Sequence, residues 1–351
     1  MTDTEATVIV DRDGALGHIE LNKPKAINAL STEMIEQVDR ALIDWQDDDS
    51  VAAVLITGAG ERGLCAGGDI KGIYRSVVDG TDESELFFSD EYRMNNRIAN
   101  YPKPYIAFMD GITMGGGVGV SVHGSVRIVT ETTKVGMPET GIGLFPDVGG
   151  TYLLARLPHE IGMYMGLTGE PVRAGAALAY GLADHFVPRA QLPALRAALT
   201  EAPAEAPEVA ADFAAQFAAE APENELARDE QWIATCFAQD SVLAIIAALR
   251  AEGSEAAAHT ADVLESKSPR SLAVTFEMIR TAKTMSLQEV LERDYRAALN
   301  IAHYPDLREG IRAQVIDKDR NPQWDPAAVS ALDEAEIRSI LDTERQEKVF
   351  S

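Results

Sequence analysis

Residues 110–121 read DGITMGGGVGVS, a stretch that places four glycines in five consecutive positions. It follows an apolar run, Tyr105 to Met109, which predicts a buried strand, and the glycines are expected to open a helix. Each glycine costs a helix roughly 1 kcal/mol relative to alanine, so another contribution must offset so dense a run. Close approach of the backbone to a ligand, or an N–H group that stabilises an oxyanion, would supply it. Tight packing of the helix on a sheet is the alternative. The stretch fits neither a Walker phosphate loop nor the G-x-G-x-x-G dinucleotide motif.

Two further glycine-rich motifs lie on either side of this stretch. Residues 65–70 read CAGGDI and follow a predicted strand, Val51 to Thr57, so their paired glycines allow backbone N–H groups to approach a ligand. An ordinary strand-to-helix turn is the alternative. Residues 135–150 read VGMPETGIGLFPDVGG and hold two carboxylates, Glu139 and Asp147, eight residues apart among apolar residues. A carboxyl group in an apolar pocket has a raised pKa and can act as a general acid or base near neutral pH. The structural alternatives are a helix N-terminal residue for Glu139 and an N-cap for Asp147.

Strand and helix patterns alternate through about residue 190, which predicts an α/β fold. Ala6 to Val10 and Ala15 to Leu21 read as a hairpin, Ser31 to Trp45 as a helix capped by Ser31, and Val126 to Thr130 as a further strand. Helical patterns then cover residues 232–237, 241–250, 256–266, 271–283 and 286–304. We therefore divide the chain into a core that holds the site, residues 1–200, an Ala/Pro/Glu-rich connection, residues 201–225, and a helical C-terminal region, residues 226–351.

The composition limits the classes of partner. The 351 residues hold 31 basic and 56 acidic side chains, a formal net charge of −25. A surface this acidic repels nucleic acid and anionic lipid, so neither is expected as a partner. No apolar run reaches the ~18 residues of a membrane helix, and the N-terminal MTDTE is neither a signal peptide nor a transit peptide. The expected location is the cytoplasm.

The two cysteines, Cys65 and Cys236, are too few for a disulfide framework and favour a reducing compartment. Cys65 is interpreted as a small buried residue in a tight turn rather than as a thiolate nucleophile. Histidines and cysteines are not clustered at the spacing of metal ligands, so no metal site is expected.

The three motifs, together with IELNKPKAINAL at residues 19–30, resemble those of the crotonase superfamily, the enoyl-CoA hydratase/isomerase family, in order and spacing. The match covers residues from about 8 to 200. It implies a spiral of ββα units, often assembled into homo-oligomers, and an acyl-CoA substrate whose CoA is not a separate cofactor. In this family two backbone N–H groups hold the thioester oxygen as an enolate or tetrahedral oxyanion. The matching positions are Gly68 and Gly116.

Within the superfamily, the 137–150 stretch closely resembles the 3-hydroxyisobutyryl-CoA hydrolase family, a branch that acts in valine degradation. Enoyl-CoA hydratases use two glutamates, which match Gly119 and Glu139, so their water-addition apparatus is incomplete in this chain. Residues 91–96 (EYRMNN), 308–313 (REGIRA) and 317–324 (DKDRNPQW) also resemble the hydrolases. The resemblance then spans nearly the whole chain, although residues 201–222 match less well.

This resemblance implies hydrolysis of the thioester of 3-hydroxyisobutyryl-CoA, or of a similar small 3-hydroxyacyl-CoA, to the free acid and CoA. Glu139 would be the nucleophile or the base that activates water, and Asp147 would position the 3-hydroxyl group or the water and carry a proton. Glu91 would bind the hydroxyl end of the substrate. The residues expected at the CoA moiety are Lys23, Lys25, Ala66, Gly67 and Ile70.

Two other functions stay open. An enoyl-CoA hydratase or isomerase could use Glu139 alone, but Gly119 argues against the hydratase. A non-catalytic acyl-CoA-binding scaffold has no need of two carboxylates, Glu139 and Asp147, in an apolar site. The acyl group, the choice between a covalent anhydride and direct attack by water, and the oligomeric state are not determined by the sequence.

Overall fold

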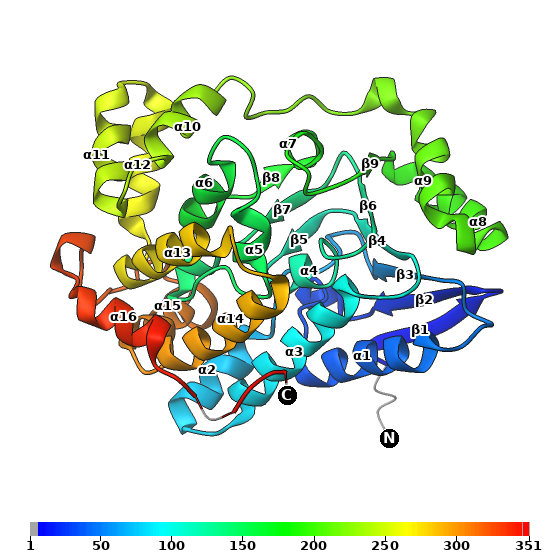
Figure 1. Cartoon of the computed structure of the whole chain (residues 1–351), viewed down its shortest axis with the longest axis horizontal. Coiled ribbons are helices and arrows are strands. Elements are labelled where there is room, and N and C mark those ends of the chain that lie inside the picture. The colour runs from blue at the N-terminus through cyan, green and yellow to red at the C-terminus, as the bar shows by residue number, and fades with distance from the viewer. Residues whose placement is uncertain (1–5, 346, 351) are drawn as a thin grey trace. The chain divides into compact units, whose positions relative to one another are not determined.

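The computed structural model describes residues 6–345 and 347–350 (Figure 1). The chain divides into two compact units, each assembled from separate stretches of sequence. Unit 1 contains the residues up to 68, together with 93–135 and 172–225. Unit 2 contains residues 69–92, 136–171 and the chain from 226 onward. The predicted division at residues 200 and 225 stays a prediction.

The core of unit 1 is a sheet with the strand order β1-β2-β3-β4-β6-β9. Its strands are β1 (Val8–Asp13), β2 (Leu16–Leu21), β3 (Ala53–Gly58), β4 (Tyr105–Met109), β6 (Val126–Val129) and β9 (His185–Phe186). The predicted hairpin is confirmed, since β1 and β2 pair antiparallel with Val8 opposite Leu21. All later pairs are parallel. Central strands with both faces covered read as continuous apolar runs, as β4 does.

The predicted helix after the hairpin is α1 (Thr32–Gln46), and Ser31 caps it by accepting a hydrogen bond from the N–H of Met34. Its buried face packs on β1 and β2. A Cβ atom on Gly17 of β2 would lie only 2.7 Å from the ring of Trp45, so glycine lets this helix lie close to the sheet.

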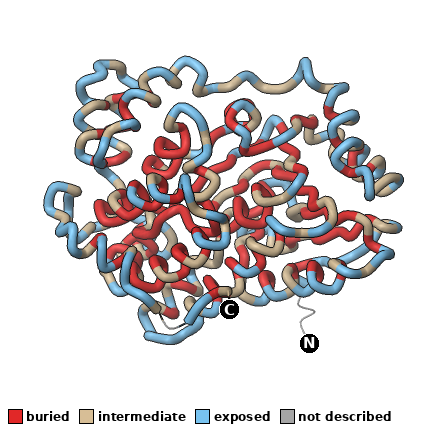
Figure 2. Tube along the Cα trace, in the orientation of Figure 1, coloured by how far each residue is buried: buried red, intermediate tan, exposed pale blue. Residues whose placement is uncertain are grey.

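The segment predicted as a connection, residues 201–225, contains helix α9 (Ala206–Ala215), which packs on β6 and β9. Together with α8 (Leu192–Glu201) it covers a buried apolar cluster. Figure 2 colours the buried residues of the chain red. Members of this cluster include Leu16, Leu55, Ile106, Ile128, Leu195, Leu199, Ala206 and Ala210. Three alanines of this alanine-rich segment, Ala206, Ala210 and Ala214, are small core residues of the helix–sheet interface. Helix α7 (Ala174–Ala179) precedes β9.

The glycine-rich stretch departs from the prediction. A short strand, β5 (Ile112–Met114), comes before the helix, and α4 (Gly116–Gly119) is only four residues long. Strand β5 belongs to a second sheet with β7 (Lys134–Gly136) and β8 (Val172–Arg173). Thr113 of β5 also forms a bridge with Cys65, and this pairing extends the chain before the helix begins.

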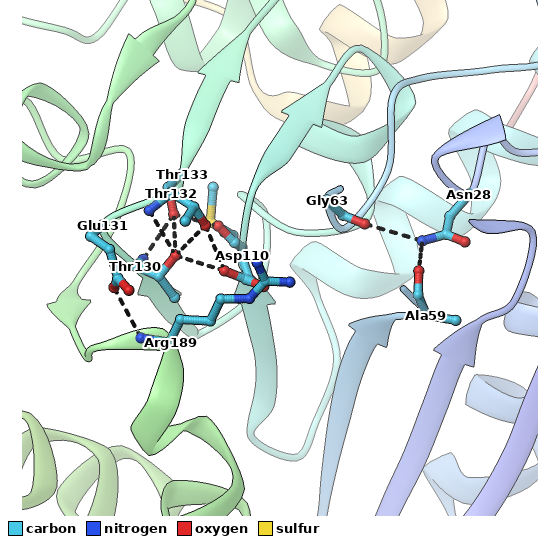
Figure 3. A network of polar contacts seen from close by, with 10 residues as sticks. Asn28, Ala59, Gly63, Asp110, Thr130, Glu131, Thr132, Thr133 and Arg189 are labelled. Carbon is cyan, nitrogen blue, oxygen red and sulfur yellow. Dashed lines mark hydrogen bonds and ion pairs between the residues drawn. The ribbon is translucent and has the colours of Figure 1, made fainter. Parts of the chain in front are cut away.

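Asp110, at the start of that stretch, is an anchor of the fold (Figure 3). Its carboxylate accepts hydrogen bonds from the hydroxyl groups of Thr130 (2.7 Å) and Thr132 (2.8 Å) and forms an ion pair with Arg189 (2.9 Å). Its carbonyl oxygen accepts a hydrogen bond from the N–H of Leu64. The glycine stretch is therefore fixed at its first residue.

Unit 2 is helical, and the predicted C-terminal helices are confirmed, with no end shifted by more than three residues. They are α10 (Glu230–Phe237), α11 (Val242–Glu252), α12 (Glu255–Ser266), α13 (Pro269–Ala282) and α14 (Leu287–Ile301). Serine caps begin α11, α12, α13 and α14, and the last has a capping box of Ser286 and Glu289. The predicted starts at residues 241 and 286 coincide with two of these caps, whereas those at 256 and 271 lie two and three residues after the caps Ser254 and Ser268.

The remaining helices of this unit are α2 (Ile70–Asp79), α5 (Gly150–Leu154), α6 (Ile161–Thr168), α15 (Pro305–Ile311) and α16 (Glu334–Asp342). Helix α3 (Glu83–Ala99) begins in unit 2, and its last seven residues are assigned to unit 1. Helix α13 packs on α5 and α6, and α14 packs on α5 and α16. Within the described ranges, no helix combines the length and the apolar character needed to cross a membrane.

Candidate active site

Glu139 stands at the start of a short 3-10 helix (Glu139–Ile142) in unit 2. The turn that follows is fixed by Gly143, which has a φ of +80° and whose added Cβ would lie 2.2 Å from the carbonyl oxygen of Asp306. The carbonyl oxygen of Thr140 accepts a hydrogen bond from the N–H of Ser268 (3.2 Å). Residues 138–143 (PETGIG) therefore form a turn that contacts α15 and the N-cap of α13, and these contacts fix the position of Glu139.

Three predicted carboxyl groups, Glu91, Glu139 and Asp147, come together in unit 2, and each is at most 6% exposed. Burial raises the pKa of Glu139 well above its usual value, and the charges of Asp147 and Glu91 raise it further. Burial and then the charge of Asp147 raise the pKa of Glu91 in the same way. The pKa of Asp147 is raised by burial to about 6. These are the shifts expected for a general acid or base.

Two of these carboxyl groups have an oxygen atom available to a ligand. Among the residues that the structure describes, neither Oε1 of Glu91 nor Oε2 of Glu139 has a hydrogen-bond partner, although both atoms are buried. Buried polar atoms are nearly always hydrogen-bonded, and exceptions gather at functional sites. We infer that a substrate or a water molecule forms the hydrogen bonds that these two oxygen atoms lack.

Tyr92 and Asp294 belong to the same cluster but were not assigned roles from the sequence. The hydroxyl group of Tyr92 donates a hydrogen bond to Oδ2 of Asp147 (2.8 Å). Asp294 of α14 is fully buried and accepts a hydrogen bond from the N–H of Gly149 (3.0 Å). An acidic residue among Leu291, Tyr295 and Ala298 on the buried face of the predicted helix was the available signal for Asp294. Tyr92 lies inside the EYRMNN segment, without a further signal of its own.

In unit 1 the two glycine motifs meet. A Cβ atom on Gly67 would lie 3.9 Å from the amide nitrogen of Gly116, and one on Gly117 would lie 2.4 Å from the carbonyl oxygen of Cys65. Close backbone approach is thus one reason for the glycine run. Gly116 is the first residue of α4, where helix geometry leaves N–H groups without intrahelical acceptors. Gly68 directly precedes Asp69, the N-cap of α2. Cys65 is buried, as expected.

Four of the five predicted CoA residues lie in unit 1, around a turn held by Asn28. Its Oδ1 accepts from the N–H of Lys23 (2.9 Å), and its Nδ2 donates to the carbonyl oxygens of Ala59 and Gly63 (3.1 Å each; Figure 3). The N–H of Ala66 donates to the carbonyl oxygen of Ile27 (2.9 Å).

These bonds bring Lys23 and Lys25 to the same part of unit 1 as Ala66 and Gly67. Lys25 is exposed and Lys23 is half-buried. Because the Ala66 N–H already has an acceptor, only its carbonyl group can serve a ligand. Ile70, the first residue of α2, lies in unit 2.

No group of three or more His, Cys, Asp or Glu side chains within residues 6–345 and 347–350 is arranged to hold a metal ion. The prediction that the reaction uses no cofactor stays a prediction.

Comparison with known proteins gives a consistent family. A family model described as enoyl-CoA hydratase/isomerase matches residues 16–341. The chain is 40% identical over 336 residues to mitochondrial 3-hydroxyisobutyryl-CoA hydrolase of Gallus gallus, covering 94% of this chain and 87% of that protein. It is 37% identical over 346 residues to the Homo sapiens protein of the same name, covering 96% and 89% of the two chains.

Two solved structures cover nearly the whole chain. A carnitinyl-CoA dehydratase from Mycobacterium thermoresistibile has a TM-score of 0.91 and 44% identity and covers 98% of both chains. An enoyl-CoA hydratase from Rhodobacter sphaeroides 2.4.1 has a TM-score of 0.89 and 40% identity, with 96% of this chain and 97% of that chain covered. The α/β fold predicted from the motifs is thereby confirmed.

Proposed function

The chain belongs to the enoyl-CoA hydratase/isomerase family, and we propose that within it the chain hydrolyses 3-hydroxyisobutyryl-CoA, or a similar small 3-hydroxyacyl-CoA, to the hydroxy acid and CoA. The observation that carries this proposal is the buried group of Glu91, Glu139 and Asp147, in which Oε2 of Glu139 has no partner among the described residues. Relatives that carry the hydrolase name over most of their length support it.

In the proposed reaction, Glu139 attacks the thioester carbonyl carbon, or removes a proton from the water that does so. The carbonyl oxygen becomes an oxyanion, and the N–H groups of Gly68 and Gly116 stabilise it. One such donor typically contributes about 2.7–4 kcal/mol to the transition state. The carbon–sulfur bond then breaks, and the CoA thiolate takes up a proton. If Glu139 is the nucleophile, water hydrolyses the resulting anhydride and regenerates its carboxylate.

The neighbouring carboxyl groups have separate roles in this proposal. Asp147, held by the hydroxyl group of Tyr92, positions the water or the 3-hydroxyl group and carries the proton. Burial favours the neutral form of Glu91, which can donate a hydrogen bond to the hydroxyl group of the substrate. A hydrolase for hydroxyacyl esters therefore makes use of all three carboxyl groups.

The structural relatives named hydratase and dehydratase make water addition the second candidate. A hydratase of this family requires a glutamate at the position of Gly119, which is a buried glycine here. A scaffold without activity is disfavoured, because burying unpaired carboxyl groups is costly and a scaffold gains nothing from them. The cytoplasmic location, the homo-oligomer and the place in valine degradation stay predictions, and the animal relatives are named as mitochondrial proteins.

One experiment tests the proposed function directly. Purified protein is given 3-hydroxyisobutyryl-CoA, and release of CoA is followed with a thiol reagent. In parallel, crotonyl-CoA is supplied and its hydration is followed by ultraviolet absorbance. We expect rapid thiol release and no hydration. Isobutyryl-CoA, which lacks the hydroxyl group, is the matched control substrate and should react more slowly. Hydration of crotonyl-CoA without thiol release would replace the proposal by a hydratase.

The pH dependence follows from the raised pKa of Glu139. Glu139 must be ionised to act, so kcat/KM is expected to fall tenfold per pH unit below an acid limb that lies well above 4.5. Asp147→Asn should lower kcat/KM and move this limb to lower pH, because the charge of Asp147 raises the pKa of Glu139. The measurement is the pH profile of the residual activity. Asp342→Asn, at an exposed position of α16, is the control. A limb that stays in place in Asp147→Asn would contradict the coupling of the two groups.

A further inference from the structure

The turn that follows Asp147 has an unusual backbone. Val148 has a φ of +51° and Gly149 a φ of +73°, so two consecutive residues adopt the left-handed region. This region is open to glycine but unfavourable for a β-branched residue such as valine. Strained conformations of this kind persist only where the surrounding structure imposes them, and they gather at functional sites.

Two consecutive residues of α14 hold this turn from about 145 residues further along the chain. Oδ2 of Asp294 accepts the hydrogen bond of the Gly149 N–H at 3.0 Å, and Nη2 of Arg293 donates to Oγ1 of Thr151 at 2.8 Å. The carbonyl oxygen of Asp147 itself accepts from the N–H of Gly150 at 2.6 Å. Asp294 and Arg293 thus form hydrogen bonds with the residues on the C-terminal side of Asp147.

Helix α14 is itself well fixed in unit 2. Arg293 also donates to Oγ1 of Thr281 (2.7 Å), and the hydroxyl group of Tyr295 donates to Glu85 (2.9 Å). The helix packs on α5, which begins at Gly150. A rigid helix that holds a strained turn defines where the carboxyl group before that turn lies.

We propose that Asp294 is a positioning residue for Asp147, which it holds in the orientation that meets the hydroxyl group of Tyr92 by accepting the Gly149 hydrogen bond. The inference deepens the proposed function and rests on it for the role of Asp147. Nothing in the chemistry requires Asp294 to touch the substrate.

The burial and the raised pKa of Asp294 are consistent with a positioning role. Its side chain is fully buried, and its Oδ1 has no hydrogen-bond partner among the described residues. Burial raises its pKa to about 8, and the charge of Asp147 adds to this, while Arg293 and the Gly149 N–H lower it. Tyr92, whose pKa is also raised well above its usual value, faces it from α3. Near neutral pH Asp294 therefore accepts the turn hydrogen bond mainly as a neutral acid and adds little negative charge beside Asp147.

The test compares two substitutions at this position. Asp294→Asn keeps the shape and an acceptor oxygen, whereas Asp294→Ala removes the acceptor. We expect Asp294→Ala to lower kcat about 100-fold, the scale of a 1 Å misplacement, with KM changed by a few-fold at most. Asp294→Asn should restore kcat to within about threefold of the wild type. The acid limb, which the ionisation of Glu139 sets, should move to lower pH in Asp294→Ala. Loss of the Tyr92 hydrogen bond raises the pKa of Asp147, and a less charged Asp147 raises the pKa of Glu139 less.

Two outcomes would overturn the proposal. Folded Asp294→Ala with wild-type kcat would reduce Asp294 to a residue of the core, and Asp294→Asn as impaired as Asp294→Ala would show that the ionisable group itself is needed. If Asp294→Ala does not fold, Thr151→Val removes the acceptor of Arg293 at the same turn and should lower kcat with the same shift of the acid limb.

A readout without substrate separates this proposal from the proposed function. Crystal structures of the wild type, Asp294→Ala and Asp294→Asn should show the 147–149 turn displaced, and the bond between Tyr92 and Asp147 broken, in the alanine variant alone. If wild-type protein fails to hydrolyse any hydroxyacyl-CoA but the turn moves in this way, only the function is wrong. If the turn stays in place in Asp294→Ala, the positioning role is wrong whatever the substrate.

Discussion

Glu139→Gln is expected to lower kcat for thioester hydrolysis by at least about 10³-fold, within the range that a positioned acid or base contributes. Glutamine has the same shape but can neither attack a carbonyl carbon nor accept a proton from water. The side chain is buried, and its Oε2 has no hydrogen-bond partner in the described part of the chain. No other base is therefore bonded at this atom to take the proton of a water molecule in place of Glu139. Glu91 and Asp147 have other roles in the proposed reaction, so neither takes the place of Glu139.

The same substitution should leave the folded protein as stable as the wild type, or more stable, at neutral pH. Folding raises the pKa of Glu139, so its ionisation destabilises the folded state above the pKa of the unfolded chain, and the effect grows until the folded pKa is passed. Glutamine removes that penalty together with the repulsion from Asp147. An inactive variant with an undiminished melting temperature would separate catalysis from folding, as expected where an active site is strained for function.

The measurement is kcat by thiol release, with circular dichroism and thermal melting on the same preparations. Glu277→Gln makes the identical change at an exposed position of α13 and should retain wild-type kcat. A Glu139→Gln variant with more than about a tenth of wild-type kcat would refute the assigned role, given the 10²–10⁴-fold that such a group supplies. In the wild type, a burst of CoA that precedes the free acid would favour the anhydride over direct attack by water.

The parts of the fold that sequence predicted are those specified by local interactions. The hairpin of β1 and β2 and the cap of α1 by Ser31 each depend on residues a few positions apart. Helix α9 and strand β5 depend on distant partners. Ala206, Ala210 and Ala214 of α9 become core residues only against β6 and β9, and β5 pairs with Cys65. The amino-acid composition of these segments does not indicate that α9 packs on β6 and β9 or that β5 pairs with Cys65.

The candidate site divides in the same way. Glu139 and Asp147 were predicted from their apolar, glycine-rich motif, and the family resemblance added Glu91 and the roles of all three. The structure adds the reason for their shifted pKa values, which is burial close to one another. Tyr92 donates a hydrogen bond to Asp147 from 55 positions away along the chain. Asp294 accepts one from Gly149, in the turn after Asp147, from 145 positions away. Periodicity describes which face of α14 is buried, but it does not say what a buried acid on that face contacts.

Gly117→Ala is expected to lower kcat by about 10²–10³-fold, the effect of losing one oxyanion donor. The added Cβ would lie 2.4 Å from the carbonyl oxygen of Cys65 and 3.1 Å from its carbonyl carbon, so the backbone of the glycine run and of the 65–67 segment must separate. Both groups are main-chain atoms, and no side-chain rotation relieves the overlap. Alanine favours a helix over glycine by about 1 kcal/mol, so a loss of activity cannot come from helix propensity.

The separation displaces the amide groups of Gly116, which directly precedes Gly117, and of Gly68, which lies three residues after Cys65. KM should change less than kcat, because the donors bind the oxyanion more strongly than the ground-state carbonyl oxygen. Kinetics on protein of verified fold measure this, and Gly72→Ala in α2 is the control, since the nearest atom to its added Cβ lies 3.9 Å away. Wild-type kcat in Gly117→Ala would show that the two glycine motifs do not form the oxyanion site. If they do, Gly117→Ala combined with Glu139→Gln should lose far less than the product of the single losses, because both changes act on one transition state.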